Sequence, residues 1–462
     1  MKKLHFITGL LTWVFVAGFF SVASCRNGNL SSPQDTAVIA TGLDTPWEIL
    51  WGPDNMLWIT ERGGTVSRIN PDSRERVVLL SIDVTQQGEA GLLGMALHPD
   101  FASNPFVYLV YNYSDAGNIR ERLVRFTLLN NQLVNEEILI NDIPGNTFHN
   151  GSRLVFDASG KLLMTTGDAG NMQLAQDPSS LNGKLLRINP DGSVPDDNPT
   201  PGSYVWALGL RNSQGLAISP SGIIYATEHG PETDDEVNIL QEGRNYGWPD
   251  VRGMCDTDTE NLFCDEFNVM EPMVAYTPTL ALAGLAWYGD GLIDEWRNSL
   301  LVTSLKAGQL LALHLNDQGT AITGTTVIYN NELGRLRDVC VSPQGRVFIS
   351  TSNRDGRGDP DADDDKIIEL YPSSATSIGD DFGSPDIRLY PNPTSGIIKA
   401  VLPDAFTNGS FEVFDLNGAV VLSGSGSFLV EGVDVSGLKQ GVYFIRILNG
   451  NSVLSFPLAV MR

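Results

Sequence analysis

The chain has 462 residues, of which 55 are acidic and 30 basic, and its formal net charge is −25 at pH 7. This acidity argues against nucleic acid and anionic membrane surfaces as partners. The length allows a large core and more than one domain. With 47 glycines and little helical periodicity, the sequence favours an all-β chain with many turns.

The first residues have the features of a secretory signal. Lys2 and Lys3 precede an apolar run over residues 6–23. Residues 22–25 also fit a lipoprotein cleavage site, so Cys25 is either a lipidated N-terminus or a cysteine that happens to follow an ordinary signal. An uncleaved anchor is the weaker alternative, because the run only just reaches spanning length. We expect residues 1–25 to be removed and the mature protein to lie outside the cytoplasm without a membrane span.

A turn, an apolar strand, a polar tip and a second strand recur six times over residues 36–371. The first strands are expected at Met56–Thr60, Val107–Tyr111, Leu162–Thr166, Ile223–Thr227, Leu300–Ser304 and Val347–Thr351. The second strands are expected at Thr65–Ile69, Arg122–Phe126, Gly183–Ile188, Glu236–Leu240, Gln309–His314 and Lys366–Leu370. Six such units predict a six-bladed β-propeller with functional loops on one rim. An array of β-sandwiches would also space strands regularly, but the uneven spacing favours the propeller.

Three cysteines follow the signal. Cys255 and Cys264 lie in one polar loop, which predicts a disulfide in an oxidising compartment. Cys340 lies in the apolar strand Val339–Val341 and is expected to be a small buried hydrophobe.

The stretch Arg211–Trp248 is the richest in functional residue types. It begins with Arg211, continues through the turn Glu228–Pro231 and the acidic residues 234–236, and ends in Asn245–Trp248. Backbone carbonyls and carboxylates together are the oxygen ligands that hard divalent cations take. A fixed cation beside such a metal would stabilise developing negative charge, so the stretch predicts one wall of an oxidising or hydrolysing site.

His149 is the histidine that best fits a catalytic base. It lies just before an apolar strand, and Asp168 lies in the next rim loop, which would let a carboxylate orient the imidazole. The alternative for Asp168 is local hydrogen bonding in a turn, a common use of aspartate. His98, in a turn, and His314, in a strand, are more simply structural.

Basic residues are few, which gives weight to those that follow strands. Lys306, Arg335 and Arg337 come from different blades than Arg211 but are expected on the same rim. In so acidic a chain this grouping predicts an anionic ligand. Solvated charges paired with nearby acids are the alternative for any one of them.

In order and spacing these motifs resemble those of the soluble sugar dehydrogenases that depend on pyrroloquinoline quinone (PQQ), the glucose/sorbosone or aldose sugar dehydrogenase family. The resemblance covers Thr41–Leu370. It rests on Gly91–Phe101, His149–Phe156, Thr166–Asp168, Leu208–Asn212, Glu228–Asn238, Asn245–Pro249, Lys306 and Arg335–Asp338. It implies an enzyme that oxidises aldose sugars, or related alcohols, to lactones and passes the electrons to an external acceptor.

The resemblance also implies a role for each site residue. His149 would take the proton of the substrate hydroxyl as a hydride passes to PQQ, with Asp168 orienting it. Arg211, with Asn212 beside it, would stabilise charge on the quinone oxygen. The other residues would bind the PQQ carboxylates and two Ca²⁺ ions: Lys306, Arg335 and Arg337 for the carboxylates, the carbonyls of Gly230 and Pro231 for the catalytic Ca²⁺, and Glu236 and Tyr246 for a structural Ca²⁺.

Two positions depart from the glucose enzymes of this family. Glu89 replaces a glutamine at the cofactor site, where a carboxylate would be unfavourable unless it is protonated or points away. Phe148 replaces an acidic residue just before His149, which argues against glucose as the substrate. A non-catalytic binding propeller, like the hedgehog-interacting relatives of this fold, and a Ca²⁺-dependent lactonase are the alternatives, because fold alone does not establish function.

The repeats end at a linker expected over residues 372–386, rich in serine, glycine and aspartate. Residues 387–462 follow, with the motifs Leu389–Gly396, Phe411–Gly418 and Leu438–Ile447. They resemble the C-terminal sorting domain of bacterial type IX secretion, a small β-sandwich recognised by the export machinery. The resemblance implies passage through the periplasm to the cell surface or the medium, and it favours an ordinary signal peptide over lipidation at Cys25.

Overall fold

The structure is a computed structural model that describes residues 29–30, 35–372, 388–402, 404–415, 419–449 and 452–461. The chain divides into two compact units, Met1–Ser373 and Ser374–Arg462. The predicted signal at residues 1–25, with Cys25, lies outside the described residues, as does the predicted linker except for Pro372. Among the residues that the structure describes, no helix is long and apolar enough to cross a membrane.

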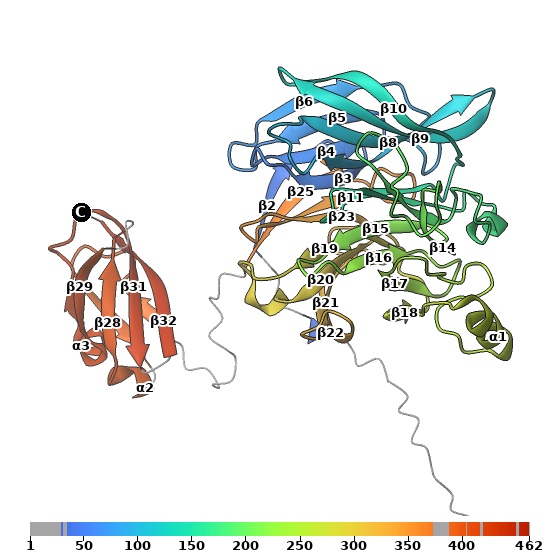
Figure 1. Ribbon diagram of the computed structural model, residues 1–462. Coiled ribbons are helices and arrows are strands. Elements are labelled where there is room, and N and C mark those ends of the chain that lie inside the picture. Colours follow the sequence, from blue (N-terminus) through green and yellow to red (C-terminus); the bar gives the residue numbers. More distant parts are fainter. Residues whose placement is uncertain are drawn as a thin grey trace, which may run out of the picture. The chain divides into compact units, whose positions relative to one another are not determined.

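Six sheets of mainly antiparallel strands make up the first unit (Figure 1). From the inner to the outer strand, the first three are β3 (Pro46–Trp51), β4 (Leu57–Glu61), β5 (Thr65–Ile69), β6 (Arg76–Ser81); β7 (Leu92–Leu97), β8 (Phe106–Asp115), β9 (Asn118–Leu129), β10 (Gln132–Pro144); and β11 (Gly151–Phe156), β12 (Leu162–Thr166), β13 (Lys184–Ile188), β14 (Val205–Leu208). The last three are β15 (Ser213–Ile218), β16 (Ile224–Glu228), β17 (Asp235–Leu240), β18 (Val274–Tyr276); β19 (Leu282–Tyr288), β20 (Ser299–Ser304), β21 (Gln309–Leu315), β22 (Ile322–Asn330), with β1 (Asn29–Leu30) beside β22; and β23 (Leu336–Val341), β24 (Val347–Thr351), β25 (Ile367–Tyr371), β2 (Asp35–Ala40).

The inner strands close these sheets into a ring. Each of β3, β7, β11, β15, β19 and β23 contacts the next, and β23 contacts β3. The last sheet joins the two ends of the propeller, because β2 from the N-terminal side pairs antiparallel with β25. Together with the four-stranded sheets, this ring confirms the predicted six-bladed propeller.

The middle strands are buried along their whole length and mostly apolar because blades cover them on both faces. Every residue of β4, β12, β13, β16 and β24 is buried. A strand buried on both faces reads as a continuous apolar run rather than an alternating one. These strands therefore coincide with the ones that the sequence predicted.

Each inner strand carries a register shift near its start. The shifts lie at Pro46/Glu48, Leu92/Met95, Gly151/Leu154, Ser213/Gly215, Leu282/Leu285 and Leu336/Asp338. Bulges of this kind re-aim side chains next to functional sites. The residues within them include Arg153, Gln214 and Arg337, which line the two cavities of the central channel. Glycine allows the strands to approach here, since a Cβ on Gly94 would lie 1.8 Å from the Ser152 oxygen.

Outside the sheets the propeller has three short helices: η1 (Met172–Ala175), α1 (Asp258–Phe267) and η2 (Asp294–Trp296). A capping box of Thr257 and Glu260 begins α1. Cys255 and Cys264 form a disulfide across its start, which confirms the predicted pairing. Cys340 is free and buried, as expected.

The second unit is a β-sandwich, as predicted. One sheet has the order β26 (Arg388–Tyr390), β27 (Ile397–Val401), β30 (Val433–Asp434), and the other has β29 (Val420–Ser425), β28 (Ser410–Phe414), β31 (Gly441–Asn449), β32 (Ser452–Val460). Two short helices, α2 (Asp404–Thr407) and α3 (Gly426–Glu431), accompany them. Side chains of both sheets, among them Ile398, Val413 and Ile445, share one core.

Candidate active site

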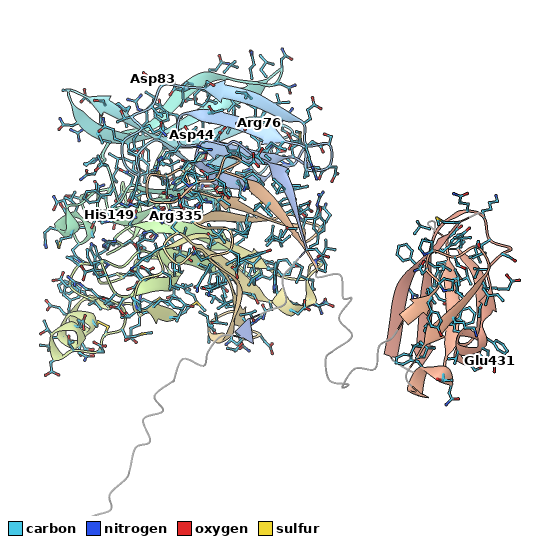
Figure 2. All side chains as sticks on the ribbon, turned by 180° about the vertical axis from the view of Figure 1, so that it is seen from behind. Asp44, Arg76, Asp83, His149, Arg335 and Glu431 are labelled. Carbon is cyan, nitrogen blue, oxygen red and sulfur yellow. A yellow bond between two sulfur atoms is a disulfide. The ribbon has the colours of Figure 1, made fainter. Side chains whose placement is uncertain are left out.

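The loops before the inner strands and the loops after the second strands surround a cavity at one mouth of the propeller channel. Its volume is about 740 Å³. Eight of the predicted residues line it: Glu89, His149, Arg211, Gly230, Pro231, Lys306, Arg335 and Arg337. His149 and Arg335, labelled in Figure 2, come from the third and sixth sheets and face the same cavity. The structure therefore brings together cations from different blades that the sequence placed on one rim.

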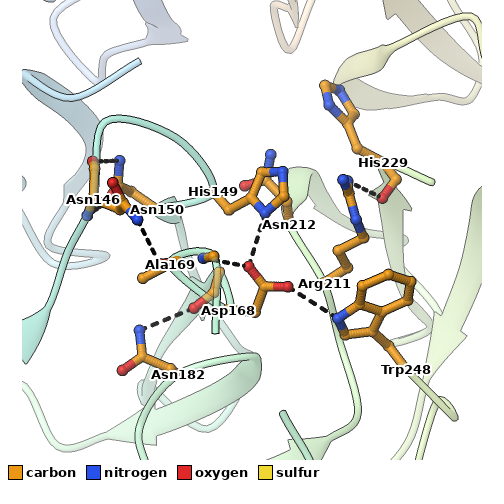
Figure 3. A network of polar contacts seen from close by, with 12 residues as sticks. Asn146, His149, Asn150, Asp168, Ala169, Asn182, Arg211, Asn212, His229 and Trp248 are labelled. Atoms are coloured by element: carbon orange, nitrogen blue, oxygen red, sulfur yellow. Dashed lines mark hydrogen bonds and ion pairs between the residues drawn. The ribbon is translucent and has the colours of Figure 1, made fainter. Parts of the chain in front are cut away.

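His149 is held by Asp168 at the edge of this cavity (Figure 3). The Nδ1 atom of His149 lies 2.8 Å from Oδ1 of Asp168. Because a carboxylate only accepts hydrogen bonds, Nδ1 carries the ring proton and Nε2 is an acceptor. Nε2 makes no hydrogen bond within the described part of the chain. The pair thus has the arrangement of a general base with its orienting acid.

Asp168 is fixed from three sides. Its Oδ1 also accepts a hydrogen bond from the Gly170 amide at 2.8 Å, and its Oδ2 accepts one from Nε1 of Trp248 at 3.0 Å. Burial disfavours its charge, but these hydrogen bonds and the His149 ring outweigh burial and lower the pKa of Asp168. The carboxylate is therefore ionised and can stabilise an imidazolium.

Arg211 lies beside the Trp248 ring. Its guanidinium carbon is 5.2 Å from the centre of the Trp248 ring, and its Nη1 donates to the His229 carbonyl at 2.8 Å (Figure 3). Trp248 thus connects Arg211 with Asp168 and fixes the separation between the cation and the base. Burial lowers the pKa of Arg211 although Asp168 lies nearby.

Asn212 has a supporting position behind the cavity. Its Oδ1 accepts hydrogen bonds from the Gly151 amide at 3.1 Å and from Nε2 of Gln214 at 3.0 Å. It therefore holds the chain just after His149, whereas the sequence predicted a contact with the cofactor. Its Nδ2 is buried and has no partner among the described residues.

The cavity has an excess of positive charge. Six basic side chains line it, Arg62, Arg211, Lys306, Arg335, Arg337 and Arg357, against three acidic ones, Glu89, Asp235 and Asp355. Four buried nitrogens in its wall have no hydrogen-bond partner among the described residues: Nε of Arg62, Arg211 and Arg337, and Nε2 of His229. Unsatisfied buried donors are costly, and an anionic ligand with several acceptors would satisfy them.

The two predicted arginines of the last blade differ in their pairing. Arg335 binds Asp355 through Nε and Nη2, at 2.9 and 2.7 Å. Arg337 is 3.6 Å from the same carboxylate, and burial lowers the pKa of Arg337 to about 10. Lys306 donates to the Thr279 hydroxyl at 3.0 Å. Arg337 and Lys306 therefore have charge left for a ligand.

Glu89 lines the cavity as an ionised group. Its Oε1 is 3.2 Å from Nη2 of Arg357, and its Oε2 accepts the His149 amide at 3.2 Å. Burial alone would raise the pKa of Glu89, but His229, Arg357 and the His149 amide lower it. The carboxylate is thus neither protonated nor turned away, the two arrangements expected from the sequence, because a cation from another blade compensates it.

The predicted metal ligands lie in two places. Gly230 and Pro231 line the main cavity, and the Gly230 amide donates to Asp235 at 2.9 Å. Glu236 lies behind them, where it accepts the Gly253 amide at 2.9 Å. The Tyr246 hydroxyl accepts the Gln241 amide and donates to the Ile239 carbonyl, so only the Tyr246 carbonyl is left as a ligand atom. Within the described ranges, no three His, Cys, Asp or Glu side chains form a metal cluster.

Several residues of the cavity received no role from the sequence, and four of them carry side-chain nitrogens: Arg62, Gln214, His229 and Arg357. His229 lies inside the turn Glu228–Pro231 that drew attention, but its imidazole received no role. Arg62, Gln214 and Arg357 also line the cavity. Position was the available signal for three of them, because Arg62, Gln214 and His229 lie at strand ends that open onto this rim, whereas Arg357 lies within the long loop after β24.

Two families match the chain. Residues 43–359 match the family described as Glucose / Sorbosone dehydrogenase. Residues 388–459 match the family described as Secretion system C-terminal sorting domain. The two matches fall in the two compact units.

Relatives with known names are similar over most of the chain. Quinoprotein glucose dehydrogenase B of Acinetobacter calcoaceticus is 30% identical, over 74% of this chain and 90% of its own length. Aldose sugar dehydrogenase of Escherichia coli (strain K12) is 30% identical, over 69% and 90%. The solved PQQ-bound aldose sugar dehydrogenase of Streptomyces coelicolor is 32% identical with a TM-score of 0.65, over 74% of this chain and 99% of that one.

Proposed function

Because the chain belongs to the glucose/sorbosone dehydrogenase family, we propose that it oxidises aldose sugars, or related alcohols, to lactones with PQQ as its cofactor. The observation that carries the proposal is the set of buried, unpartnered donors of Arg62, Arg211 and Arg337 beside the His149–Asp168 pair. A general base without an anion site would suit many reactions, and an anion site without a base would bind a ligand without reacting with it. Their combination in one cavity fits an anionic redox cofactor and a hydroxyl substrate.

The cavity fits PQQ in size and charge. PQQ is a flat tricarboxylate, and the volume of about 740 Å³ leaves room beside it for a sugar. Lys306, Arg335 and Arg337 would bind the carboxylates, and Arg62 adds a further donor. When bound, PQQ supplies the redox chemistry by accepting a hydride from the sugar carbon.

The residues of the chain supply the proton chemistry and the positioning. His149 accepts the proton of the sugar hydroxyl at Nε2, while Asp168 keeps the ring in the required tautomer and stabilises its positive charge. Arg211 stabilises the negative charge that develops beside it, from a position fixed by the Trp248 ring. Asn212 acts through the backbone by holding Gly151, two residues after His149.

Calcium is part of the proposal. Gly230 and Pro231 line the cofactor cavity, and their carbonyls would hold one Ca²⁺ there. The Glu236 carboxylate and the Tyr246 carbonyl, which line the small cavity behind, would hold a structural Ca²⁺. The oxygen-only character of both donor sets supports calcium rather than a softer metal.

The tail indicates where the protein acts. Its match to a secretion sorting domain indicates export to the cell surface or the medium. We propose that an ordinary signal peptide takes the chain into the periplasm and that the type IX machinery exports it. The electrons would then pass to an acceptor outside the outer membrane.

The same residues distinguish the proposed dehydrogenase from two alternative functions. A non-catalytic binding propeller needs no oriented base such as His149–Asp168. A Ca²⁺-dependent lactonase needs a metal-bound water but no group of cations such as Arg62, Arg211 and Arg337. Lactone hydrolysis without PQQ would favour the lactonase, and PQQ binding without dye reduction would favour the binding protein.

The test is to add PQQ and Ca²⁺ to the purified protein and to follow dye reduction with a panel of sugars, with and without a chelator. We expect His149→Ala to lower kcat by about 10²–10⁴-fold, the usual contribution of a positioned base, and to leave PQQ binding in place. His98→Ala is the matched control, because His98 packs against Phe106 and Phe156 away from the cavity. A His149→Ala protein that reduced the dye at the parental rate would contradict the mechanism.

A further inference from the structure

A lysine is completely buried beside the loop that carries Asp168. Lys184 is the first residue of β13 and is 0% exposed. Lysine is almost never fully buried unless its charge is compensated. Here backbone oxygens compensate it, because Nζ donates hydrogen bonds to the carbonyls of Leu174, Ala175 and Asn182 at 2.7, 2.9 and 2.7 Å. The lysine therefore ties three points of the chain together.

This group of carbonyls requires the charged form of the lysine. An ammonium group has three N–H donors, one for each carbonyl, whereas a neutral amine has only two. Burial lowers the pKa of Lys184 to about 7, with Asp177 opposing the shift, and the hydrogen bonds to the carbonyls favour the ammonium form against burial. Oxygen atoms gathered around a cation are otherwise the ligands of a metal ion. Lys184 thus takes the place that a metal ion would have among these carbonyls.

The three carbonyls belong to the loop between β12 and β13, residues 167–183, which begins with Gly167 and Asp168. Nδ2 of Asn182, near the end of this loop, donates to the Gly167 carbonyl at its start, at 3.0 Å (Figure 3). Asn182 is in turn held by Lys184 through its own carbonyl. The lysine therefore fixes the turn from which the Asp168 side chain extends.

A second route from Lys184 to Asp168 runs through the helix η1. Ala175, whose carbonyl Lys184 binds, is the last residue of η1, and Gln176 follows it. Nε2 of Gln176 donates to the Trp248 carbonyl at 2.7 Å. Nε1 of Trp248 in turn donates to the Asp168 carboxylate at 3.0 Å. Lys184 therefore supports Asp168 both through its own loop and through its tryptophan partner.

We propose that Lys184 is a positioning residue of the reaction site, which holds the Asp168 carboxylate in place against His149. Lys184 does not line the cofactor cavity, so it acts only through Asp168 and Trp248. The effect on turnover rests on the proposed function, whereas the fixed loop does not depend on it. Because the cations of the cavity are untouched, loss of Lys184 should slow the reaction without weakening the binding of cofactor or sugar.

The kinetic test replaces Lys184 by methionine, which is unbranched and apolar and has no donor. We expect Lys184→Met to lower kcat by about 10–100-fold, because misplacing a reacting group by about 1 Å can cost as much, with unchanged KM for the sugar and unchanged PQQ affinity. In an Asp168→Asn background the same change should have little further effect, since residues that act as a unit are not additive. Lys161→Met is the matched control, because Lys161 is half-buried at the other end of β12 and binds the Asn189 side chain at 2.7 Å.

An equal loss of kcat in the parental and the Asp168→Asn backgrounds would overturn the inference, because a lysine that only stabilises the fold would lower both alike. Gln176→Leu tests the same route at a half-buried position, where failure to fold is less of a risk. It too should lower kcat in the parental background and not in Asp168→Asn. Parental turnover in Gln176→Leu would likewise contradict the inference.

Hydrogen exchange of the cofactor-free protein gives a second readout that needs no turnover. Lys184→Met should speed exchange at the amides of Gly170 and Asn171, which donate to the carboxylate and the carbonyl of Asp168, and leave the amides of β12 unchanged. If no sugar is oxidised but exchange in the loop is faster, the proposed function fails and the role of Lys184 in fixing the loop is supported. Unchanged exchange across the loop would overturn the inference whatever the activity.

Discussion

Two groups of charged residues, each with a buried arginine, line different cavities of the propeller, and their pairing is opposite. Below the cofactor cavity, Arg153 is 3% exposed and lies 2.7 Å from Glu48 and 2.9 Å from Asp338. In the cavity wall, Arg337 is 5% exposed and its nearest carboxylate, Asp355, is 3.6 Å away. The neighbouring residues Arg337 and Asp338 thus contribute to different groups, on either side of the bulge in β23.

The pKa values of Arg153 and Arg337 shift in opposite directions because the two arginines are paired differently. Burial opposes the charge of both arginines, but Asp338 and Glu48 raise the pKa of Arg153, whereas burial prevails and lowers the pKa of Arg337. The charge of a buried cation with two carboxylates is neutralised within the fold. The charge of a buried cation without a carboxylate of its own is neutralised only when an anion binds, so the comparison separates structural from functional arginines.

The largest effect is expected on stability from removal of the paired cation. Arg153→Met leaves Glu48 and Asp338 buried without a counter-charge, which costs about 3–5 kcal/mol when one partner of a buried pair is removed. Urea unfolding of the propeller measures this loss. Adding Glu48→Gln and Asp338→Asn to Arg153→Met should recover much of it. An unchanged urea midpoint for Arg153→Met would show that the group does not stabilise the fold.

A smaller effect, on the cofactor rather than on the fold, is expected at Arg337. Arg337→Met should weaken PQQ binding by about 10–100-fold, the effect of one or two charge-assisted hydrogen bonds. Without PQQ the variant should unfold at the same urea concentration as the wild type or a higher one, because the buried, unpartnered Nε is removed. PQQ titration and unfolding without PQQ measure both, with Arg297→Met as the exposed control.

If Arg337→Met destabilised the cofactor-free protein as strongly as Arg153→Met does, the distinction between the two groups would fail. A variant with parental PQQ affinity would remove Arg337 from the cofactor site. The two outcomes are independent, since one concerns the empty cavity and the other the loaded one.

The fold was predictable where burial alone decides the pattern. The middle strands, such as β12 and β24, are buried at every position, begin with three apolar residues and stand out between turn residues. The inner strands were missed because a bulge interrupts each of them and polar residues such as Arg153 and Gln214 lie inside it. The same irregularity that hides these strands in the sequence places the residues of the two arginine groups.

Most roles in the site were predicted through the motifs of a known family rather than from the pattern of residues. Spacing alone suggested His149 with Asp168, and the structure places their side chains 2.8 Å apart. The compensation of Glu89 by Arg357 joins residues of different blades, and no local pattern connects them. His229 was overlooked because it lies within a motif whose other residues carried the argument.

The smallest effect is expected at a third buried ionisable group, Glu121, where the comparison concerns the pH dependence of stability. Within the described part of the chain no cation lies near Glu121 of β9, whose carboxylate accepts one hydrogen bond, from the Ser152 hydroxyl at 2.9 Å. Burial raises the pKa of Glu121 to about 8. Because this pKa lies above the ordinary value of 4.5, the contribution of Glu121 to stability is complete below about pH 4.5 and is lost as the pH rises through 8. Glu121→Gln should therefore reduce the fall in Tm between pH 6 and 8.5 by a few degrees, corresponding to about 1–2 kcal/mol. Thermal unfolding at the two pH values measures it, with the exposed Glu242→Gln as control. An unchanged pH dependence would mean that a carboxylate can stay charged here without a cation, against the rule that the arginine groups suggest.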